Sequence, residues 1–315
     1  MAKSKSTSRK TSKSKNSTPA VRHLRYELTN SSNAGTETSH YIDLARDISA
    51  INRRLYRQGR AYHVRKVTII SSNTPNAANR ISISTVPDSW TARGAWKRGF
   101  AYWNEHHKDA MRMGETKRGR FADYKVHLSD AGRTGTQLVP KDNGGNLLQL
   151  GEWNYSTMVT PDGTTTTDSF DLHMLGAHNG AAGSRVSVGL VQSYGETRTT
   201  INNQVPNVPG TASDDPLANI FDSGTQHDEV IDNIEGENDN CPYDITNYPG
   251  MSGNMAKPLV VADTTLMDGK ATVGGFVALC GLLEIEATSP IGSDVFSVLV
   301  ELAPGNYRGV SADVI

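Results

Sequence analysis

Alternation of apolar and polar residues predicts short β-strands over much of the chain. Residues 63–71 (HVRKVTIIS) and 80–86 (RISISTV) alternate and are rich in Val and Ile. A period of two places alternate side chains on one face of a sheet. Together with the other runs of this kind, the pattern predicts about eight strands. The other runs are 121–128, 147–159, 168–175, 185–194, 272–287 and 295–302.

Two stretches have the period of an amphipathic helix instead. Apolar residues recur at spacings of three and four within 41–59. Trp96, Phe100 and Trp103 form an aromatic stripe within 90–113, which is more typical of a core than of a base-stacking surface. Because helices do not alternate with strands, the order of elements favours a mainly β fold. We expect a single eight-stranded antiparallel jelly roll, a type of β-sandwich, with two inserted helices and a disordered basic N-terminal arm.

Charge is separated along the chain, although the net charge of all 315 residues is only -1. Residues 1–133 hold 26 Lys and Arg against 10 Asp and Glu, a balance of +16. Residues 134–315 hold 6 against 23, a balance of -17. A chain divided in this way carries an electric dipole, and its basic end favours a polyanionic partner.

The basic end begins with a segment that cannot build a core. Residues 1–18 are almost entirely Lys, Arg, Ser and Thr, and residues 1–26 contain no acidic side chain. We predict that 1–26 is a disordered nucleic-acid-binding arm and that 27–315 is one shell domain. Each cation that meets a phosphate releases counterions, so binding is independent of sequence and sensitive to salt. A solubilising tail or a nuclear-localisation signal is the alternative.

Arginines near the end of the first predicted helix lie close to this arm in the sequence, so we add them to the candidates. The alternative for these arginines is a solvated helix face, favoured slightly by the helix dipole. The candidate nucleic-acid-binding residues are Lys3, Lys5, Arg9, Lys10, Lys13, Lys15, Arg22, Arg25, Arg53, Arg54 and Arg57.

Residues 199–256 form the opposite kind of region, with ten Asp and Glu and no Lys or Arg. We predict an acidic surface loop between strands. Closely spaced carboxylates supply the oxygen ligands that hard divalent cations prefer, but a solvated acidic loop is the stronger interpretation. The candidate metal ligands are Asp228, Asp232, Glu235, Glu237 and Asp239.

The sequence lacks several common catalytic motifs. There is no phosphate-binding loop of the GxxxxGK[ST] type and no His-Glu-x-x-His, and 250–254 (GMSGN) misses the nucleophile-elbow pattern at its last position. We therefore predict neither an enzyme nor a cofactor. No run approaches 18 apolar residues, so no transmembrane helix is expected.

Several motifs occur in an order that resembles a known group of proteins. They are the basic arm, 52–59 (NRRLYRQG), Ser89-Trp90, 95–103 (AWKRGFAYW), 228–235 (DEVIDNIE) and 248–250 (YPG). This order resembles the capsid proteins of small circular single-stranded DNA viruses, especially the bacilladnavirus-like and stool-associated circular virus-like groups. The arm is less rich in arginine than circovirus arms, which speaks against a circovirus.

The resemblance implies a jelly-roll subunit that self-assembles into an icosahedral shell and packages a single-stranded genome. Residues from Lys3 to Arg25 would match the internal arm that contacts the genome. Capsids of this group are similar to those of nodavirus-like and tombusvirus-like RNA viruses, some of which hold Ca²⁺ between subunits, and 228–239 would match an exposed or interfacial acidic loop. The expected partners are other copies of the chain and viral single-stranded nucleic acid, without membrane insertion. The expected location is the virion, and the host nucleus or cytoplasm during assembly.

Three other functions remain open at this point. One is the capsid protein of a nodavirus-like or tombusvirus-like positive-strand RNA virus, because charge does not separate DNA from RNA. Another is a non-viral nucleic-acid-binding module with an acidic regulatory loop. The third is a jelly-roll protein that binds or cleaves carbohydrate, which would leave the basic arm unexplained.

Overall fold

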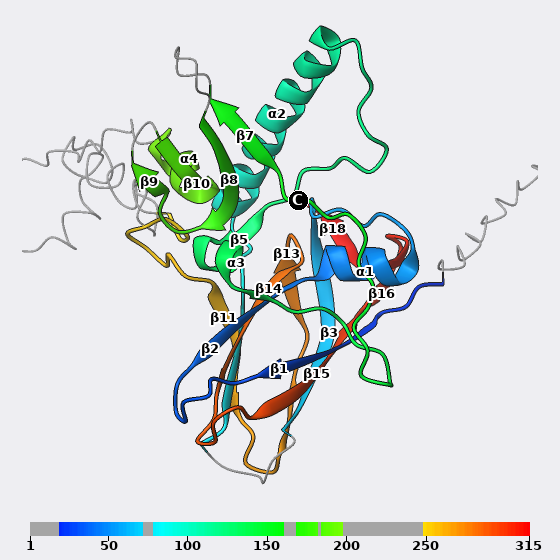
Figure 1. The fold of residues 1–315 in the computed structure, drawn as a ribbon, viewed down its shortest axis with the longest axis vertical. Helices are drawn as coiled ribbons and strands as arrows, with labels where there is room; N and C mark the ends of the chain where they lie inside the picture. Colours follow the sequence, from blue (N-terminus) through cyan, green and yellow to red (C-terminus); the bar gives the residue numbers. More distant parts are fainter. Residues whose placement is uncertain (1–18, 72–77, 161–167, 182–183, 198–247) are drawn as a thin grey trace, which may run out of the picture.

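The computed structural model describes residues 19–71, 78–160, 168–181, 184–197 and 248–315 (Figure 1). The prediction of a mainly β fold is confirmed, and the strands form several sheets. Two of the sheets pack face to face, and a third sheet lies with most of the helices at one end of them.

The first sheet is wholly antiparallel and is centred on one long strand, β3 (Arg60–Ser71). β15 pairs with one side of β3, and three shorter strands pair elsewhere along it. β1 forms the outer strand beside β15. These strands are β1 (His23–Thr29), β15 (Val295–Leu302), β12 (Lys270–Val273), β13 (Phe276–Leu279) and β18 (Ala312–Val314).

The second sheet has the order β11-β4-β14-β2-β6. Its first four strands pair antiparallel, and β6 adds to β2 in parallel. The strands are β11 (Leu259–Thr265), β4 (Arg80–Thr85), β14 (Leu282–Thr288), β2 (Thr38–Asp43) and β6 (Thr136–Gln137).

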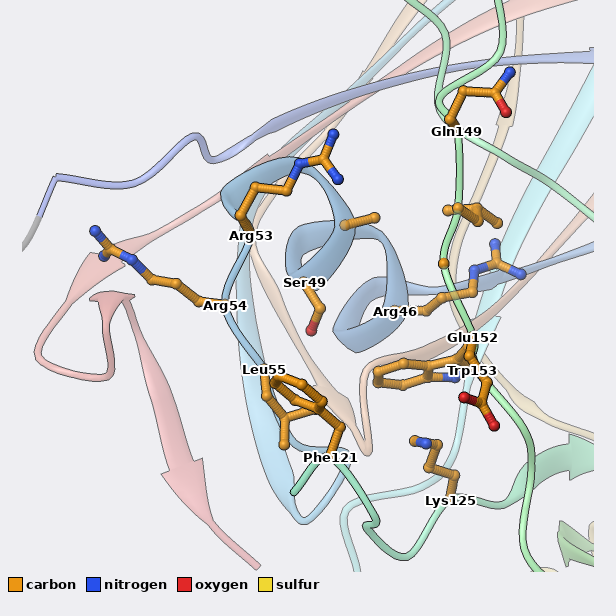
Figure 2. Close-up of a pocket in the computed structure, with 13 residues that line it drawn as sticks. Arg46, Ser49, Arg53, Arg54, Leu55, Phe121, Lys125, Gln149, Glu152 and Trp153 are labelled. Atoms are coloured by element: carbon orange, nitrogen blue, oxygen red, sulfur yellow. The ribbon is translucent and has the colours of Figure 1, made fainter. Parts of the chain in front are cut away.

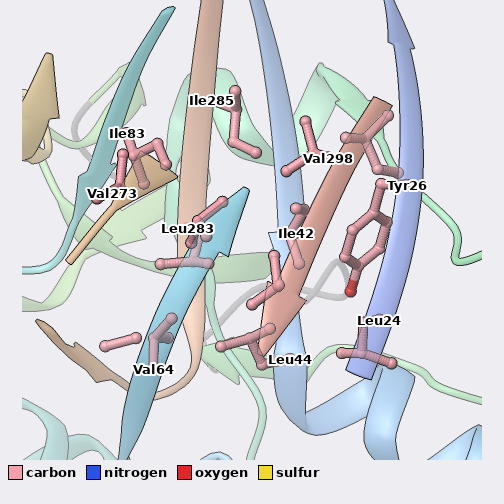
Figure 3. Packing of buried hydrophobic residues seen from close by; sticks show 14 of the residues in the cluster. Leu24, Tyr26, Ile42, Leu44, Val64, Ile83, Val273, Leu283, Ile285 and Val298 are labelled. Carbon is pink, nitrogen blue, oxygen red and sulfur yellow. The ribbon is translucent and has the colours of Figure 1, made fainter. Parts of the chain in front are cut away.

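The core between these two sheets follows from the alternation seen in the sequence. Every second residue of β15 is buried, and Leu24 and Tyr26 of β1 point inward in the same way. They meet Ile83 and Ile285 from the second sheet (Figure 3). Burying a side chain of this size contributes about 1.5–3 kcal/mol, so the two sheets are held mainly by this layer.

Eight strand positions make up the two packed sheets if β12 and β13, which both pair with β3, are counted as one position. In chain order the positions are β1, β2, β3, β4, β11, β12 with β13, β14 and β15. The first sheet then has the order 1-8-3-6, and the second has the order 2-7-4-5. Every connection except the one from β4 to β11 therefore crosses from one sheet to the other.

The connection from β4 to β11 holds a large insertion, residues 86–258. Its third sheet has the order β5-β8-β10-β9, with β7 paired to β8. A second apolar cluster joins this insertion to the sandwich, with Trp96 and Tyr124 among its buried members. The elements are α2 (Trp90–Met113), β5 (His127–Ser129), α3 (Asp130–Thr134), β7 (Thr157–Thr160), β8 (Asp168–Leu175), β9 (Asn179–Ala181), β10 (Ser184–Gly189) and α4 (Leu190–Glu196).

Three predicted elements are confirmed at their ends: the helix 90–113 and the strands 168–175 and 295–302. The expectation of only antiparallel pairs is wrong, because β5 and β10 both run parallel to β8. The counts are also too low, since the described residues contain four helices and more than eight strands. A small hairpin of β16 (Pro304–Gly305) and β17 (Gly309–Val310) follows β15.

The first predicted helix, 41–59, is too long at both ends. Residues up to Asp43 belong to β2, where they pair with β14, and α1 covers only Leu44–Asn52. Asp43 caps the helix by accepting a hydrogen bond from the backbone of Arg46. Arg53 ends it in the left-handed conformation, with φ 54°.

Candidate nucleic-acid interface

Many of the predicted site residues lie outside the described residues. These are Lys3, Lys5, Arg9, Lys10, Lys13 and Lys15 of the arm, and the candidate metal ligands Asp228, Asp232, Glu235, Glu237 and Asp239. Of the predicted acidic loop 199–256, only 248–256 is described. Arg22, Arg25, Arg53, Arg54 and Arg57 are the predicted binding residues that the structure places.

The predicted boundary of the arm at residue 26 is wrong. β1 begins at His23, and Leu24 and Tyr26 are fully buried in the sandwich core. In the sequence, Leu24 and Tyr26 alternate with polar residues as they would in a strand, but the positive charge around them led to their assignment to the arm. The body of the protein therefore begins before residue 23.

Hydrogen bonds attach the start of the described chain to the C-terminal end of α1. The backbone N–H of Val21 donates to Oδ1 of Asn52 over 2.7 Å, and Nδ2 of Asn52 donates to the carbonyl of Val21 over 3.0 Å. Nη1 of Arg54 donates to the carbonyl of Pro19 over 3.5 Å. The basic segment 1–18 is therefore joined to the body next to the end of α1.

Two arginines with no carboxylate partner among the described residues lie at this junction. Arg53 and Arg54 are both exposed, and Figure 2 shows their side chains leaving the end of α1 in different directions. Helix carbonyls at a C-terminus favour nearby cations, which stabilises this arrangement. Both arginines keep their full charge available for an anion from solution.

Two further arginines, which the sequence did not indicate, lie near the ring of Tyr307. The hydroxyl of Tyr307 accepts a hydrogen bond from the backbone N–H of Arg57. The guanidinium of Arg60 lies 3.7 Å from the centre of the Tyr307 ring, and that of Arg308 lies 5.8 Å from it. Arg308 also donates to the carbonyl of Leu55, directly after Arg54. We call Arg53, Arg54, Arg60 and Arg308 the arm-base arginine cluster. No sequence pattern joins 53–60 to 308, because only the fold brings them together.

The predicted binding residue Arg57 is engaged in the fold instead. Its Nη1 donates to Oδ1 of Asp123 over 2.8 Å, and the carboxylate of Asp123 is nearly buried. Burial raises the pKa of Asp123, and the Arg57 charge opposes that rise. Arg57 therefore holds residue 123 against the start of β3 and carries little free charge.

Arg25 is also paired, and Arg22 has only a local partner. Arg25 lies 2.6 Å from Oε1 of Glu27, which Lys141 contacts as well. The hydrogen bond from Lys141 is the main reason that the pKa of Glu27 is lowered. Nη1 of Arg22 donates to the carbonyl of Ala20 over 3.5 Å. Of the five predicted arginines that are described, Arg53 and Arg54 are thus the exposed ones without a carboxylate partner among the described residues.

The chemistry of the arm-base arginine cluster is that of an anion-binding surface. Each contact between an arginine and a phosphate releases counterions, and guanidinium groups match phosphate geometry with two parallel hydrogen bonds.

Within the described residues, no three His, Cys, Asp or Glu side chains gather where they would hold a metal. None of the described helices is both long and apolar enough to cross a bilayer. No family model, curated protein or solved structure matches this chain.

Proposed function

We propose that the chain is the capsid subunit of a small circular single-stranded DNA virus, of the bacilladnavirus-like or stool-associated circular virus-like kind. Copies of it would assemble into an icosahedral shell and package the genome through the basic arm. The observation that carries this proposal is the junction at α1, where Pro19, which follows the cationic segment 1–18 in the sequence, is bonded to Arg54 of the arm-base arginine cluster.

The strand order supports a jelly roll as the shell-forming fold. Jelly rolls consist of two packed sheets whose strands follow two Greek keys. The orders 1-8-3-6 and 2-7-4-5 have consecutive strands in opposite sheets at nearly every step, which is the result of folding a long hairpin over itself. Such a body is rigid and leaves its loops for contacts with neighbours.

Charge separation supports a container for nucleic acid. Packed phosphates repel one another, so a shell needs positive charge where the genome lies and no such charge on its outer surface. The balance of +16 in residues 1–133 and -17 in the rest would supply both if the polarity runs from the inside of the shell to the outside. Neutralised phosphate then favours assembly, and many weak contacts between subunits make the shell cooperative.

Deletion of residues 2–18 tests the role of the arm. The deletion stops before β1, so we expect the body to keep its melting temperature while the purified particles lose most of their nuclease-protected nucleic acid. A matched control replaces Lys108 and Arg112, exposed cations near the far end of α2, with serine. Unchanged packaging after the arm deletion, or an equal loss in the control, would contradict the proposed role.

Two alternatives give different results in the same preparation. An RNA-virus capsid protects material that ribonuclease, and not deoxyribonuclease, digests after the particles are opened. A non-viral binding module forms a small closed oligomer and prefers particular sequences, because base readout requires contacts to base edges.

A further inference from the structure

A cavity of about 390 Å³ opens beside the arm-base arginine cluster. It lies between α1 with the residues that follow it, residues 121–125 and residues 149–153 (Figure 2). Its volume falls in the range of about 300–1,000 Å³ that is typical of small-molecule sites. Arg53, Arg54, Leu55, Phe121, Lys125 and Trp153 are among the residues that line it.

The cavity presents two aromatic rings of different kinds. Phe121 is 65% exposed, which is unusual for a side chain of its size. The ring of Trp153 is fixed, because its Nε1 donates to the buried carboxylate of Asp43 over 2.9 Å. Gln58 donates to the same carboxylate, so the group that positions Trp153 is itself held. One wall is therefore rigid and the other is an uncovered apolar ring.

Lys125 provides the cavity with a cation that lacks a full set of partners. It is 6% exposed, yet among the described residues its ammonium makes one hydrogen bond, to the carbonyl of Asn154 over 3.4 Å, and no ion pair. Its Nζ lies 4.5 Å from the centre of the Trp153 ring. An ammonium has three donors, so the site has donors left for an acceptor that enters from outside. Burial also lowers the pKa of Lys125.

We propose that this cavity binds one unpaired nucleotide of the packaged single strand. The base would cover Phe121, an acceptor of the nucleotide would meet Lys125, and the phosphates on either side of the nucleotide would lie toward Arg53 and Arg54. A base stacks on an aromatic ring only when it is free of its own duplex, so the site selects single strands. This inference rests on the proposed function, because it deepens the role of the same interface.

The surroundings favour a nucleotide over the other candidates for this cavity. The arm is cationic and is repelled by Arg53, Arg54 and Lys125. The acidic segment 228–239 of the chain would satisfy those charges but contains no aromatic ring to cover Phe121. Glu152 lines the cavity on the side of Trp153 away from Arg53 and Arg54, which orients the phosphate toward the arginines (Figure 2). Because Pro19 is bonded to Arg54, a strand gathered by the arm arrives at the mouth of the cavity.

The test uses the full chain and a short oligothymidylate, with an abasic oligonucleotide of equal charge for comparison. Binding is measured at salt concentrations that screen the arm, because stacking depends less on salt than phosphate contacts do. The variant is Phe121→Ala, and the matched control is Tyr102→Ala, which removes another exposed aromatic ring, on α2. Photocrosslinking with 5-iododeoxyuridine in the oligonucleotide then maps the contact by mass spectrometry.

We expect Phe121→Ala to weaken oligothymidylate binding about tenfold, in line with the usual contribution of one stacked base. Binding of the abasic oligonucleotide and the behaviour of Tyr102→Ala should not change, and the crosslink should lie within 121–125 or 149–153. Equal binding by the Phe121→Ala variant overturns the inference. So does stronger competition by a synthetic acidic peptide with the sequence 228–239.

The two proposals fail in distinguishable ways. If the particles protect nucleic acid in an arm-dependent manner while Phe121→Ala has no effect, the nucleotide site is wrong and the capsid function stands. If no closed particle forms, or if the particles protect no nucleic acid, the capsid function itself is wrong.

Discussion

A buried histidine in the third sheet should make the protein lose stability in mild acid. His173 on β8 is fully buried and lies opposite His127 on the parallel strand β5. Burial is the main reason that the pKa of His173 is lowered to about 4, while Asp130 and the carbonyl of Ala177 oppose that shift. We test this histidine with His173→Gln, whose amide can still donate to the carbonyl of Ala177.

The direction in which the free energy of unfolding changes with pH follows from the unfolded chain, in which a histidine has a pKa of about 6.5. As the pH falls below that value, the unfolded state binds a proton that the folded state refuses, so the free energy of unfolding decreases. The full effect is about 3 kcal/mol, reached below about pH 4, because one pKa unit corresponds to about 1.4 kcal/mol. About 2 kcal/mol of it is already lost between about pH 8 and about pH 5.

Urea unfolding of the natural chain and of His173→Gln at both pH values measures this contribution. We expect the variant to be less stable at the higher pH and the gap to narrow by about 2 kcal/mol at the lower one. The comparison cancels groups away from this site, such as Asp47, whose pKa burial raises to about 6 and which acts in the opposite direction. A stability gap that is equal at both pH values would show that His173 is not held neutral by burial.

Three substitutions test the packing of α2 and a buried hydrogen bond. In Gly99→Ala the new Cβ would lie 2.3 Å from the hydroxyl of Tyr124, so we expect the free energy of unfolding in urea to fall by about 1–3 kcal/mol. The control is Gly274→Ala, whose new Cβ has nothing within 4 Å and should lower that free energy far less. An equal cost at the two glycines would argue against close packing of α2. Tyr26→Phe removes the 2.6 Å hydrogen bond to buried Asp47 and should lower stability by about 1–3 kcal/mol, whereas an unchanged melting curve would refute that role.

The expected strand 121–128 shows where alternation in the sequence falls short. Tyr124 and Val126 are fully buried there, but Asp123 and Lys125 are nearly buried as well, so burial does not follow a period of two. Tyr124 and Val126 pack in the cluster formed with α2, whereas pairing with a neighbouring strand begins only at His127, in β5. A period of two indicates which side chains would face a core in a strand, but the strand also needs a neighbouring backbone at the right distance. That neighbour comes from distant sequence.

At other positions too, contacts with distant parts of the chain determine an element other than the one that the local sequence pattern predicts. Tyr41 fits the apolar stripe of the first helix, yet pairing with Glu284 of β14 places it in β2. The expected strand 185–194 changes to helix α4 at Leu190, which packs on α2. The arm-base arginine cluster shows the same difference. Arg53 and Arg54 were predicted from the sequence, whereas Arg308 bonds to the carbonyl of Leu55 only because the hairpin of β16 and β17 brings it there.

The proposed function requires that copies of this chain close into a shell with the arm on the inside. Electron microscopy of the purified full-length protein, with nuclease treatment before and after the particles are opened, can detect such a shell. We expect closed particles whose nucleic acid resists nuclease until they are opened, with density for the arm on the inner surface. Protein that stays monomeric with nucleic acid at every salt concentration and pH tried, or an arm that projects outward, would contradict it.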